Sequence, residues 1–385
     1  MLANLVGLLL LCSASAAGAK VDWNRPWTIP QDPAAAISDG DEYAWRLFVA
    51  MNWPADPKTG EADQGKALGG PSPVGVVWEN WQEAGDIFME GGKVPAAWRG
   101  SNQANAGHSR FTALPVEQRV RRAIEAGCTE KFAEPSVGAE VRFNEAAYCY
   151  IRTNKLNSLQ GQIDAYFNNK KISFPAESKV VKAAWTEIDK CQRRSYYAVS
   201  EGDKLYGLVG LNVMAKHQST WFWATFEHVD NKSAIGNNVG WKLSSRDNFA
   251  CKSDQPDCEG TPVGIGLQGT VWDNYRLRGT QIRYVDQKSV PVLLANSKLE
   301  DRFQETSSCM TCHARAAILV ERGVARRLPF FKNAPGSLCN APMNGQEPQQ
   351  AEGYVGVPLP EWFAGSQGQK GYMQQDFLWS FCRAK

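Results

Sequence analysis

KLYGLVGLNVMAKHQSTWFWATFEHV, residues 204–229, is the stretch that decides the fold. Residues 204–216 and 221–229 each alternate apolar or aromatic side chains with other residues, the two-residue period of a β-strand. The turn-forming residues 218–220 separate them, so the stretch predicts an antiparallel hairpin. One face of the second strand should carry Phe222, Ala224, Phe226 and His228, and the other Trp221, Trp223, Thr225 and Glu227.

Helical and strand patterns alternate irregularly in the rest of the chain. Residues 41–53 place apolar side chains at helical spacing, which predicts a helix that begins near Asp39. Further strands are expected at 139–152 and 275–285, and a short amphipathic segment at 178–188. Because no regular βαβ order appears, the pattern favours an α+β fold with antiparallel strands.

The chain has 385 residues, enough for one large domain or two smaller ones. We expect a single domain over residues 20–385, in which residues 20–135 could form an N-terminal subdomain. The net charge is only +2, so no broad basic surface indicates a nucleic-acid partner.

The first residues are typical of a secretory signal peptide. A short apolar run at Leu5 to Leu11 precedes Ala17-Gly18-Ala19, an A-x-A cleavage pattern. We therefore expect residues 1–19 to be removed and the protein to be exported, with a periplasmic location. No later segment is apolar over the roughly 20 residues that a membrane-spanning helix needs.

The strongest motif is Cys309-Met310-Thr311-Cys312-His313, residues 309–313. This Cys-x-x-Cys-His spacing is that of haem c attachment. The two thiols form thioethers with the haem vinyl groups, and the imidazole that follows coordinates the iron. Ser307 and Ser308 are good helix caps, and a helix is expected from Cys309 toward Arg322. The motif predicts one covalent haem held by Cys309, Cys312 and His313.

Two other interpretations of the motif stay open. A redox-active dithiol would use the two cysteines without needing His313. A zinc site would need a second cysteine pair at similar spacing, and Cys251 and Cys258 are too far apart in sequence to suggest one.

The ligand on the other side of the iron would decide the chemistry, since a strong sixth ligand favours electron transfer and an open site favours oxygen or peroxide chemistry. His228 is our candidate for that position, as ligand or as acid–base catalyst, because its expected strand face is apolar. A buried, hydrogen-bonded core histidine is the alternative for His228. The weaker candidates are His108, His217, Met343 and Met373.

Two haem propionates need cationic or N–H partners. Arg276, Arg278 and Arg283 alternate along the expected strand at 275–285, and the first two are candidates for these partners.

Several stretches together resemble a family of exported bacterial c-type cytochrome proteins. The matching pieces include AWRLFVAMNWP at 44–54, GLVGLNV at 207–213, FWATFEHVDN at 222–231, NYRLRGTQ at 274–281 and SSCMTCHA at 307–314. Some members of that family look related to periplasmic fatty-acid dioxygenases and hydroperoxide diol synthases. Relatives tend to carry extra histidines around Asn212 to Lys216, which this chain lacks.

Motif and resemblance together predict a periplasmic mono-haem c redox protein. We favour an oxidoreductase that uses oxygen or peroxide on an apolar substrate, as the resemblance implies for fatty acids. An electron-transfer cytochrome with a redox partner protein is the alternative, and a haem-based gas sensor is the third.

The remaining cysteines should form disulfides in an exported protein. Without Cys12 and the motif pair, seven are left, so at least one is unpaired within the chain: Cys128, Cys149, Cys191, Cys251, Cys258, Cys339 and Cys382. Cys251 and Cys258 flank a short polar loop and are the easiest pair to join. Cys128 with Cys149, and Cys339 with Cys382, are further pairings to consider.

A disulfide between Cys251 and Cys258 should stabilise the folded chain by about 2–3 kcal/mol, because it closes a short loop in the unfolded state. Peptide mapping of the unreduced protein should find the two peptides joined, and a reduced, alkylated sample is the control. Recovery of both cysteines as free thiols from the unreduced protein would contradict the pairing.

Overall fold

The predicted hairpin is the centre of the fold. The computed structural model describes residues 21–98, 138–232, 246–251, 260–300, 304–328, 355–365 and 370–385. Strand β5 (Lys204–Ala215) pairs antiparallel with β6 (Phe222–His228), with Leu211 opposite Phe226. The hairpin expected from the sequence is therefore confirmed.

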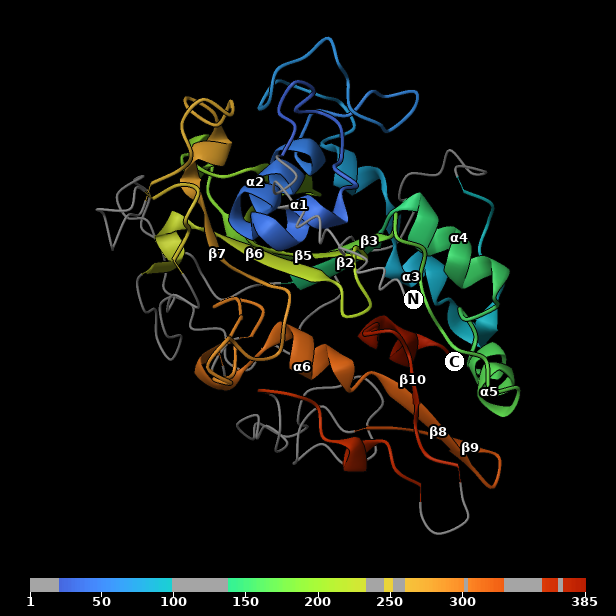
Figure 1. Cartoon of the computed structure of the whole chain (residues 1–385). Helices are drawn as coiled ribbons and strands as arrows, with labels where there is room; N and C mark the ends of the chain where they lie inside the picture. Colours follow the sequence, from blue (N-terminus) through green and yellow to red (C-terminus); the bar gives the residue numbers. More distant parts are fainter. Residues whose placement is uncertain are drawn as a thin grey trace, which may run out of the picture.

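Around this hairpin the described residues form a seven-stranded antiparallel sheet in the order β1-β2-β3-β5-β6-β7, with β4 paired to β5 (Figure 1). Its other strands are β1 (Gln82–Glu83), β2 (Gly138–Phe143), β3 (Lys179–Ile188), β4 (Ala198–Glu201) and β7 (Tyr275–Gln281). A three-stranded sheet in the order β10-β8-β9 consists of β8 (Ala317–Glu321), β9 (Val324–Arg327) and β10 (Met373–Gln374).

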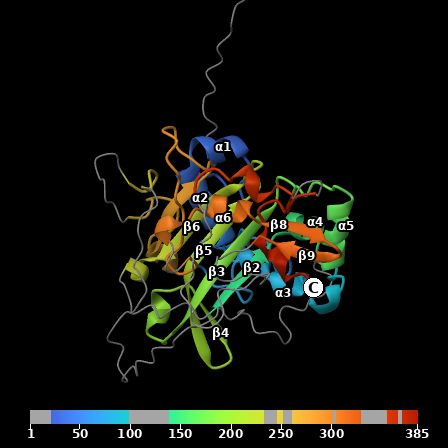
Figure 2. The ribbon, with the colours of Figure 1, turned by 90° about the horizontal axis from the view of Figure 1, so that it is seen from below.

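Helices lie on both sides of the large sheet. The α-helices are α1 (Pro33–Ser38), α2 (Gly40–Met51), α3 (Ala84–Ile87), α4 (Glu145–Thr153), α5 (Leu159–Phe167) and α6 (Cys309–Ala314). Short 3-10 helices include Val77–Asn80, Glu90–Gly92, Gln192–Arg194, Val229–Lys232, Val271–Asn274, Gln304–Thr306, Pro360–Trp362 and Trp379–Arg383. Figures 1 and 2 show α1 and α2 on one face of the sheet and α6 with the small sheet on the other.

Helix α2 forms the core on its face of the sheet. It begins after Asp39, as expected. The negative charges of Asp41 and Glu42 in its first turn interact favourably with the helix dipole. Its side chains are almost all buried, and they pack in one hydrophobic cluster with Phe226 of β6 and Leu277 of β7. The described part of residues 20–135 therefore shares a core with the sheet.

The opposite face of the sheet has its own hydrophobic cluster. Trp223 of β6 and Met214 of β5 pack there with Cys309 and Met310 of α6 and with Phe381 of the C-terminal 3-10 helix. Alternate residues of β6 thus belong to two different cores, because successive strand side chains point to opposite faces. The motif helix is anchored to the face that carries Trp223.

Three local expectations were wrong. The strand expected over 139–152 ends at Phe143, because Asn144 caps α4 by accepting a hydrogen bond from the Ala147 backbone N–H. The strand expected over 275–285 ends at Gln281. The helix expected to run from Cys309 toward Arg322 ends at Ala314, because the apolar run Ala317–Glu321 pairs as a strand with β9 and β10.

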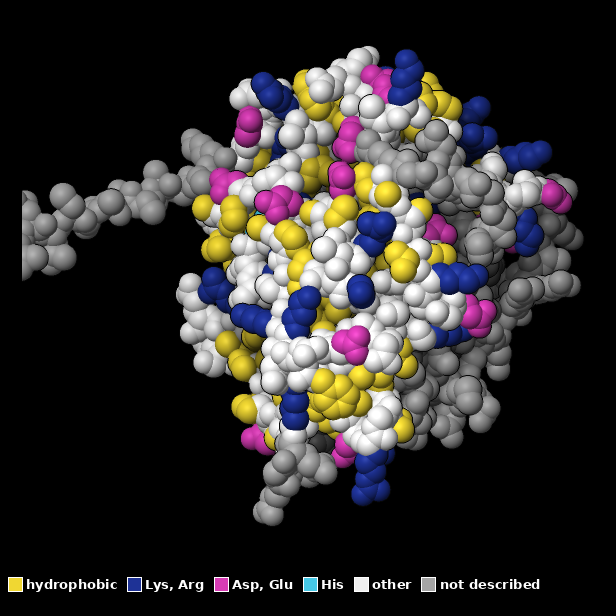
Figure 3. All heavy atoms as spheres, turned by 90° about the vertical axis from the view of Figure 1, so that its right-hand side faces the viewer, with side chains coloured by type: hydrophobic (Ala, Val, Ile, Leu, Met, Phe, Trp, Pro, Cys, Tyr) yellow, Lys and Arg dark blue, Asp and Glu magenta, His cyan; other side chains and the backbone are white. Residues whose placement is uncertain are grey.

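The α+β fold with antiparallel sheets is confirmed by this arrangement. The signal peptide expected at residues 1–19 lies outside the described residues. Within the described ranges we find no helix with the length and hydropathy needed to cross a membrane. On the face shown in Figure 3, basic, acidic and hydrophobic side chains are interspersed, in keeping with the net charge of +2.

The cysteines agree in part with the expectations. Cys191, Cys251 and Cys382 are disulfide-bonded. Cys258 lies outside the described residues, so its pairing with Cys251 stays a prediction. Cys149 is a free thiol on α4, so its suggested bond with Cys128 is wrong.

The core under α2 yields a stability prediction. Phe48 is fully buried, and its ring centroid lies 4.4 Å from that of Phe226. Phe48→Ala should lower the free energy of unfolding by about 3–5 kcal/mol, because it leaves a cavity in a packed core. Phe167→Ala is the matched control: this side chain is 61% exposed, and its loss should change stability by less than about 0.5 kcal/mol. Urea unfolding measures the free energy of unfolding of both variants. Equal losses of stability in the two variants would contradict this description of the core.

Candidate haem-attachment site

The predicted attachment motif, Cys309–His313, makes up nearly all of the short helix α6. Ser308 is its N-cap, with a side chain that accepts a hydrogen bond from the Thr311 backbone N–H. Gln281, the last residue of β7, holds this end of the helix against the sheet. Its Nε2 donates to Ser308 Oγ at 2.8 Å, and its Oε1 accepts from the Met310 backbone N–H at 3.1 Å. The motif is therefore fixed to the sheet through polar contacts that its sequence alone does not indicate.

Both motif cysteines are free thiols and both are buried. The Cys309 thiol donates to the Leu294 carbonyl oxygen, with a distance of 3.1 Å between the two heavy atoms. Burial, together with the nearby Glu300 carboxylate, raises the pKa of Cys312 to about 12. Burial likewise raises the pKa of Cys309 well above its ordinary value. Reactive redox dithiols depend on a lowered thiol pKa, so these surroundings argue against the dithiol interpretation.

His313 is oriented by a backbone carbonyl. Its Nδ1 lies 2.8 Å from the Phe377 carbonyl oxygen, and because that oxygen can only accept, Nδ1 carries the hydrogen. Burial lowers the pKa of His313 to about 4, so the ring is neutral at physiological pH. A neutral ring protonated on Nδ1 leaves Nε2 as a lone-pair donor, the usual arrangement of an imidazole that binds a metal.

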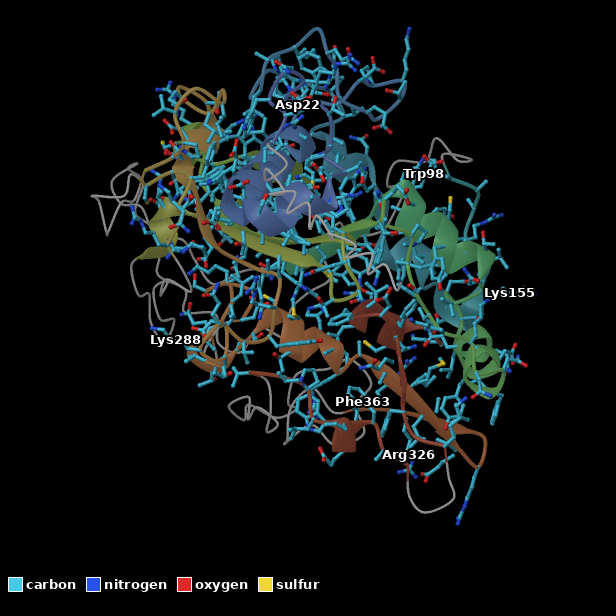
Figure 4. All side chains as sticks on the ribbon, in the orientation of Figure 1. Asp22, Trp98, Lys155, Lys288, Arg326 and Phe363 are labelled. Carbon is cyan, nitrogen blue, oxygen red and sulfur yellow. The ribbon has the colours of Figure 1, made fainter. Side chains whose placement is uncertain are left out.

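Aromatic side chains and the C-terminal segment enclose the motif. The Trp223 ring of β6 lies 4.7 Å from the His313 ring, centroid to centroid. The Trp379 indole N–H donates to the Cys312 carbonyl oxygen at 3.1 Å. Side chains fill the space between the α6 ribbon and the sheet, and the labelled Phe363 lies beyond α6 on the side away from Asp22 (Figure 4). Chain segments far apart in sequence thus meet at this motif.

The contacts of His228 are those of a core residue. Its ring stacks on Tyr196 with a centroid distance of 3.7 Å and lies 5.3 Å from the ring of Tyr275, which belongs to the core shared with α2. Its Nε2 is 2.9 Å from the Ser195 carbonyl oxygen, and its Nδ1 accepts from the Asp230 backbone N–H at 3.2 Å. Both ring nitrogens are satisfied and the side chain is fully buried. These contacts favour the alternative of a hydrogen-bonded core histidine for His228 over an iron ligand or catalyst.

His217 lies on the α2 side, where its ring contacts that of Tyr43 in α2. Its Nε2 lies 2.5 Å from the Tyr43 hydroxyl, and burial lowers its pKa to about 3. His108 and Met343 lie outside the described residues. Met373 is in β10, opposite Ile318 of β8.

The arginines proposed for the propionates contact other groups. Arg276 donates to the backbone oxygens of Asp273 and Tyr275, at 2.7 and 2.9 Å. Arg278 is buried, which lowers its pKa to about 10, and the Glu227 carboxylate opposes that shift. Arg283 is exposed. Their role toward a propionate stays a prediction.

A lysine on the sheet is a cation that the sequence analysis missed. Lys182 of β3 acts electrostatically on Cys309, Cys312 and His313, although it is not the largest influence on any of them. It stands directly opposite Asn212 in the register of β3 and β5. No local signal marks it, because strand pairing alone brings it under the motif. Lys182 is thus a further candidate for a propionate partner.

The residues present fit a covalently attached haem. Two unbonded thiols and an imidazole whose Nε2 keeps its lone pair follow one another on a single short helix. Within the described ranges, no group of three or more His, Cys, Asp or Glu side chains is placed to hold a metal ion. A haem c would need one protein ligand and two thioethers here, which these three residues can provide.

Comparison with known proteins adds no relative on which to test this assignment. No protein-family model matches the chain, and neither a curated protein nor a solved structure does.

Proposed function

We propose that this chain is an exported protein with one haem c, bound by thioethers to Cys309 and Cys312 and by His313 to the iron. One observation carries the proposal: the Phe377 carbonyl fixes the His313 Nδ1–H, so Nε2 keeps its lone pair on the same short helix as two free thiols. The haem would supply redox chemistry and a site where oxygen or peroxide can bind.

The protein residues around the motif have separate tasks in this proposal. Gln281 and Ser308 hold the start of the helix, so the two thiols keep their positions relative to the sheet. Phe377 orients the imidazole through its carbonyl, while Trp223 packs against the same ring and helps exclude water. A fixed ring orientation matters because the direction of Nε2 determines how the iron is held.

Within this class we favour an oxidoreductase that uses oxygen or peroxide on an apolar substrate. An electron carrier with two histidine ligands would need a second imidazole at the iron. His217 is hydrogen-bonded to Tyr43 of α2, and His228 to Ser195 and Asp230, so both rings are engaged by other partners. The resemblance to exported c-type cytochrome proteins, some of which look related to fatty-acid dioxygenases, points to the same role and to a periplasmic location.

Replacement of the motif cysteines tests the attachment. The parent protein, produced with an intact haem-maturation system, should keep its haem through acid–acetone extraction and gain the mass of one haem. Cys309→Ala with Cys312→Ala should lose all covalently bound haem, because no thioether can form. Cys149→Ala is the matched control, since Cys149 is also a free thiol but lies on α4. A colourless parent protein would refute the proposal.

Binding of carbon monoxide to the ferrous protein tests the choice between catalysis and electron transfer. We expect rapid binding in the parent, since the rings of His217 and His228 are both held by other partners. His228→Ala should bind carbon monoxide at the same rate, with an unchanged ferric spectrum, while its free energy of unfolding falls by roughly 2–4 kcal/mol through lost buried hydrogen bonds. Refusal of carbon monoxide by the parent would favour the electron carrier. Binding gained only in His228→Ala would contradict the structural role assigned to His228.

A further inference from the structure

A strained turn leads into the segment that contacts His313. Asp376 and Phe377, between β10 and the C-terminal 3-10 helix, have φ angles of 46° and 68°. Left-handed backbone is tolerated by aspartate but is uncommon for a bulky residue such as phenylalanine. Such strain persists only where surrounding contacts compensate for it, and it is concentrated at functional sites.

A buried ion pair holds this turn in place. Asp376 Oδ1 lies 2.5 Å from Lys216 Nζ, and the two side chains are only 6% and 8% exposed. The same oxygen accepts from the Trp221 indole N–H at 3.2 Å, and Oδ2 accepts from the Phe174 backbone N–H at 2.7 Å. The Lys216 ammonium also lies 5.3 Å from the centre of the Trp221 ring. The carboxylate of Asp376 thus joins the turn to the end of β5, to the residue before β6 and to the loop at Phe174.

The residue after this carboxylate supplies the carbonyl that orients His313. The Phe377 oxygen lies 2.8 Å from His313 Nδ1, and two residues later the Trp379 indole N–H binds the Cys312 carbonyl. The Phe377 ring also faces Trp223, which itself contacts His313. A shift of the turn at Asp376 would therefore move the carbonyl away from the imidazole.

We propose that Asp376 and Lys216 are positioning residues that set the strength of the hydrogen bond from His313 Nδ1 to the Phe377 carbonyl. The inference rests on the proposed function, because its consequence at the iron requires a bound haem. A strong bond from Nδ1–H raises the basicity of Nε2 and stabilises the ferric iron. The ion pair would thereby keep the reduction potential of this protein low.

Stability alone does not explain this ion pair. Desolvation of two buried charges costs about as much as their attraction returns, so packed hydrophobic residues would serve a purely structural role equally well. The charges do give the turn one fixed position, because Asp376 must reach its Lys216, Trp221 and Phe174 partners together. A fixed position is what a single short hydrogen bond at His313 requires.

Two variants separate the charge from the backbone. Asp376→Asn keeps a residue that tolerates left-handed backbone but removes the charge. Lys216→Met removes the partner charge and leaves the turn sequence intact. Glu140→Gln is the matched control: Glu140 is fully buried, lies 2.8 Å from Arg142 and accepts from the Trp185 indole N–H, but its Trp185 partner belongs to the core on the α2 face.

In the haem-loaded protein, both test variants should shift the midpoint potential to more positive values and lower the iron–histidine stretching frequency of the ferrous form. Glu140→Gln should leave both quantities at their parent values. The inference would be overturned if Asp376→Asn and Lys216→Met had the midpoint potential and stretching frequency of the parent. It would also be overturned if Glu140→Gln shifted these two quantities equally. If one test variant does not fold, the other alone decides.

A parent protein without haem would refute the proposed function but would leave the positioning role of Asp376 and Lys216 open. A second measurement, which needs no haem, tests that role. Nitrogen-15 NMR of the histidine rings reports which nitrogen of His313 holds the hydrogen. We expect Nδ1–H in the parent and in Glu140→Gln, and a loss of that preference in Asp376→Asn and Lys216→Met. The same tautomer in all four proteins would overturn the positioning role.

Discussion

The alternation of side chains along β6 is the constraint on which the rest of the structure depends. Phe222 and Phe226 point into the core formed with α2, whereas Trp223 points to the face that holds α6. A register shift of one residue would exchange these two sets, so pairing with β5 and β7 fixes both cores at once. The position of the motif helix follows from which of these side chains it meets.

The motif face depends on polar contacts as much as on hydrophobic ones. Gln281 at the end of β7 satisfies backbone and cap groups at the start of α6, where a helix has no partners of its own. On the other side of the motif, the strained turn at Asp376 brings the Phe377 carbonyl to His313. The sheet thus holds the thiols while the C-terminal segment orients the imidazole, and the proposed haem site needs both.

The hydrogen-bond partners of the histidine rings differ in the same way between the core and the motif. The rings of His228 and His217 are buried and hydrogen-bonded, so they contribute to core stability. Among the histidines of the described ranges, His313 has one ring nitrogen fixed by a carbonyl and is the one that fits a ligand role. Residue type is therefore a poor guide to function here, and the partner of each ring nitrogen is a better one.

The sequence by itself determined the central hairpin, the helix after Asp39 and the spacing of Cys309, Cys312 and His313, because strand alternation, helix periodicity and a five-residue motif are local properties. It failed where tertiary pairing overrides local preference: the run after Ala314 became strand β8 through its partners β9 and β10. Tertiary packing alone surrounded His228 with Tyr196 and Tyr275 and brought Trp223, Lys182 and Phe377 to the motif. These residues come from strands and a turn far apart in the chain, and such contacts arise only when the sheet pairs and the C-terminal segment packs against it.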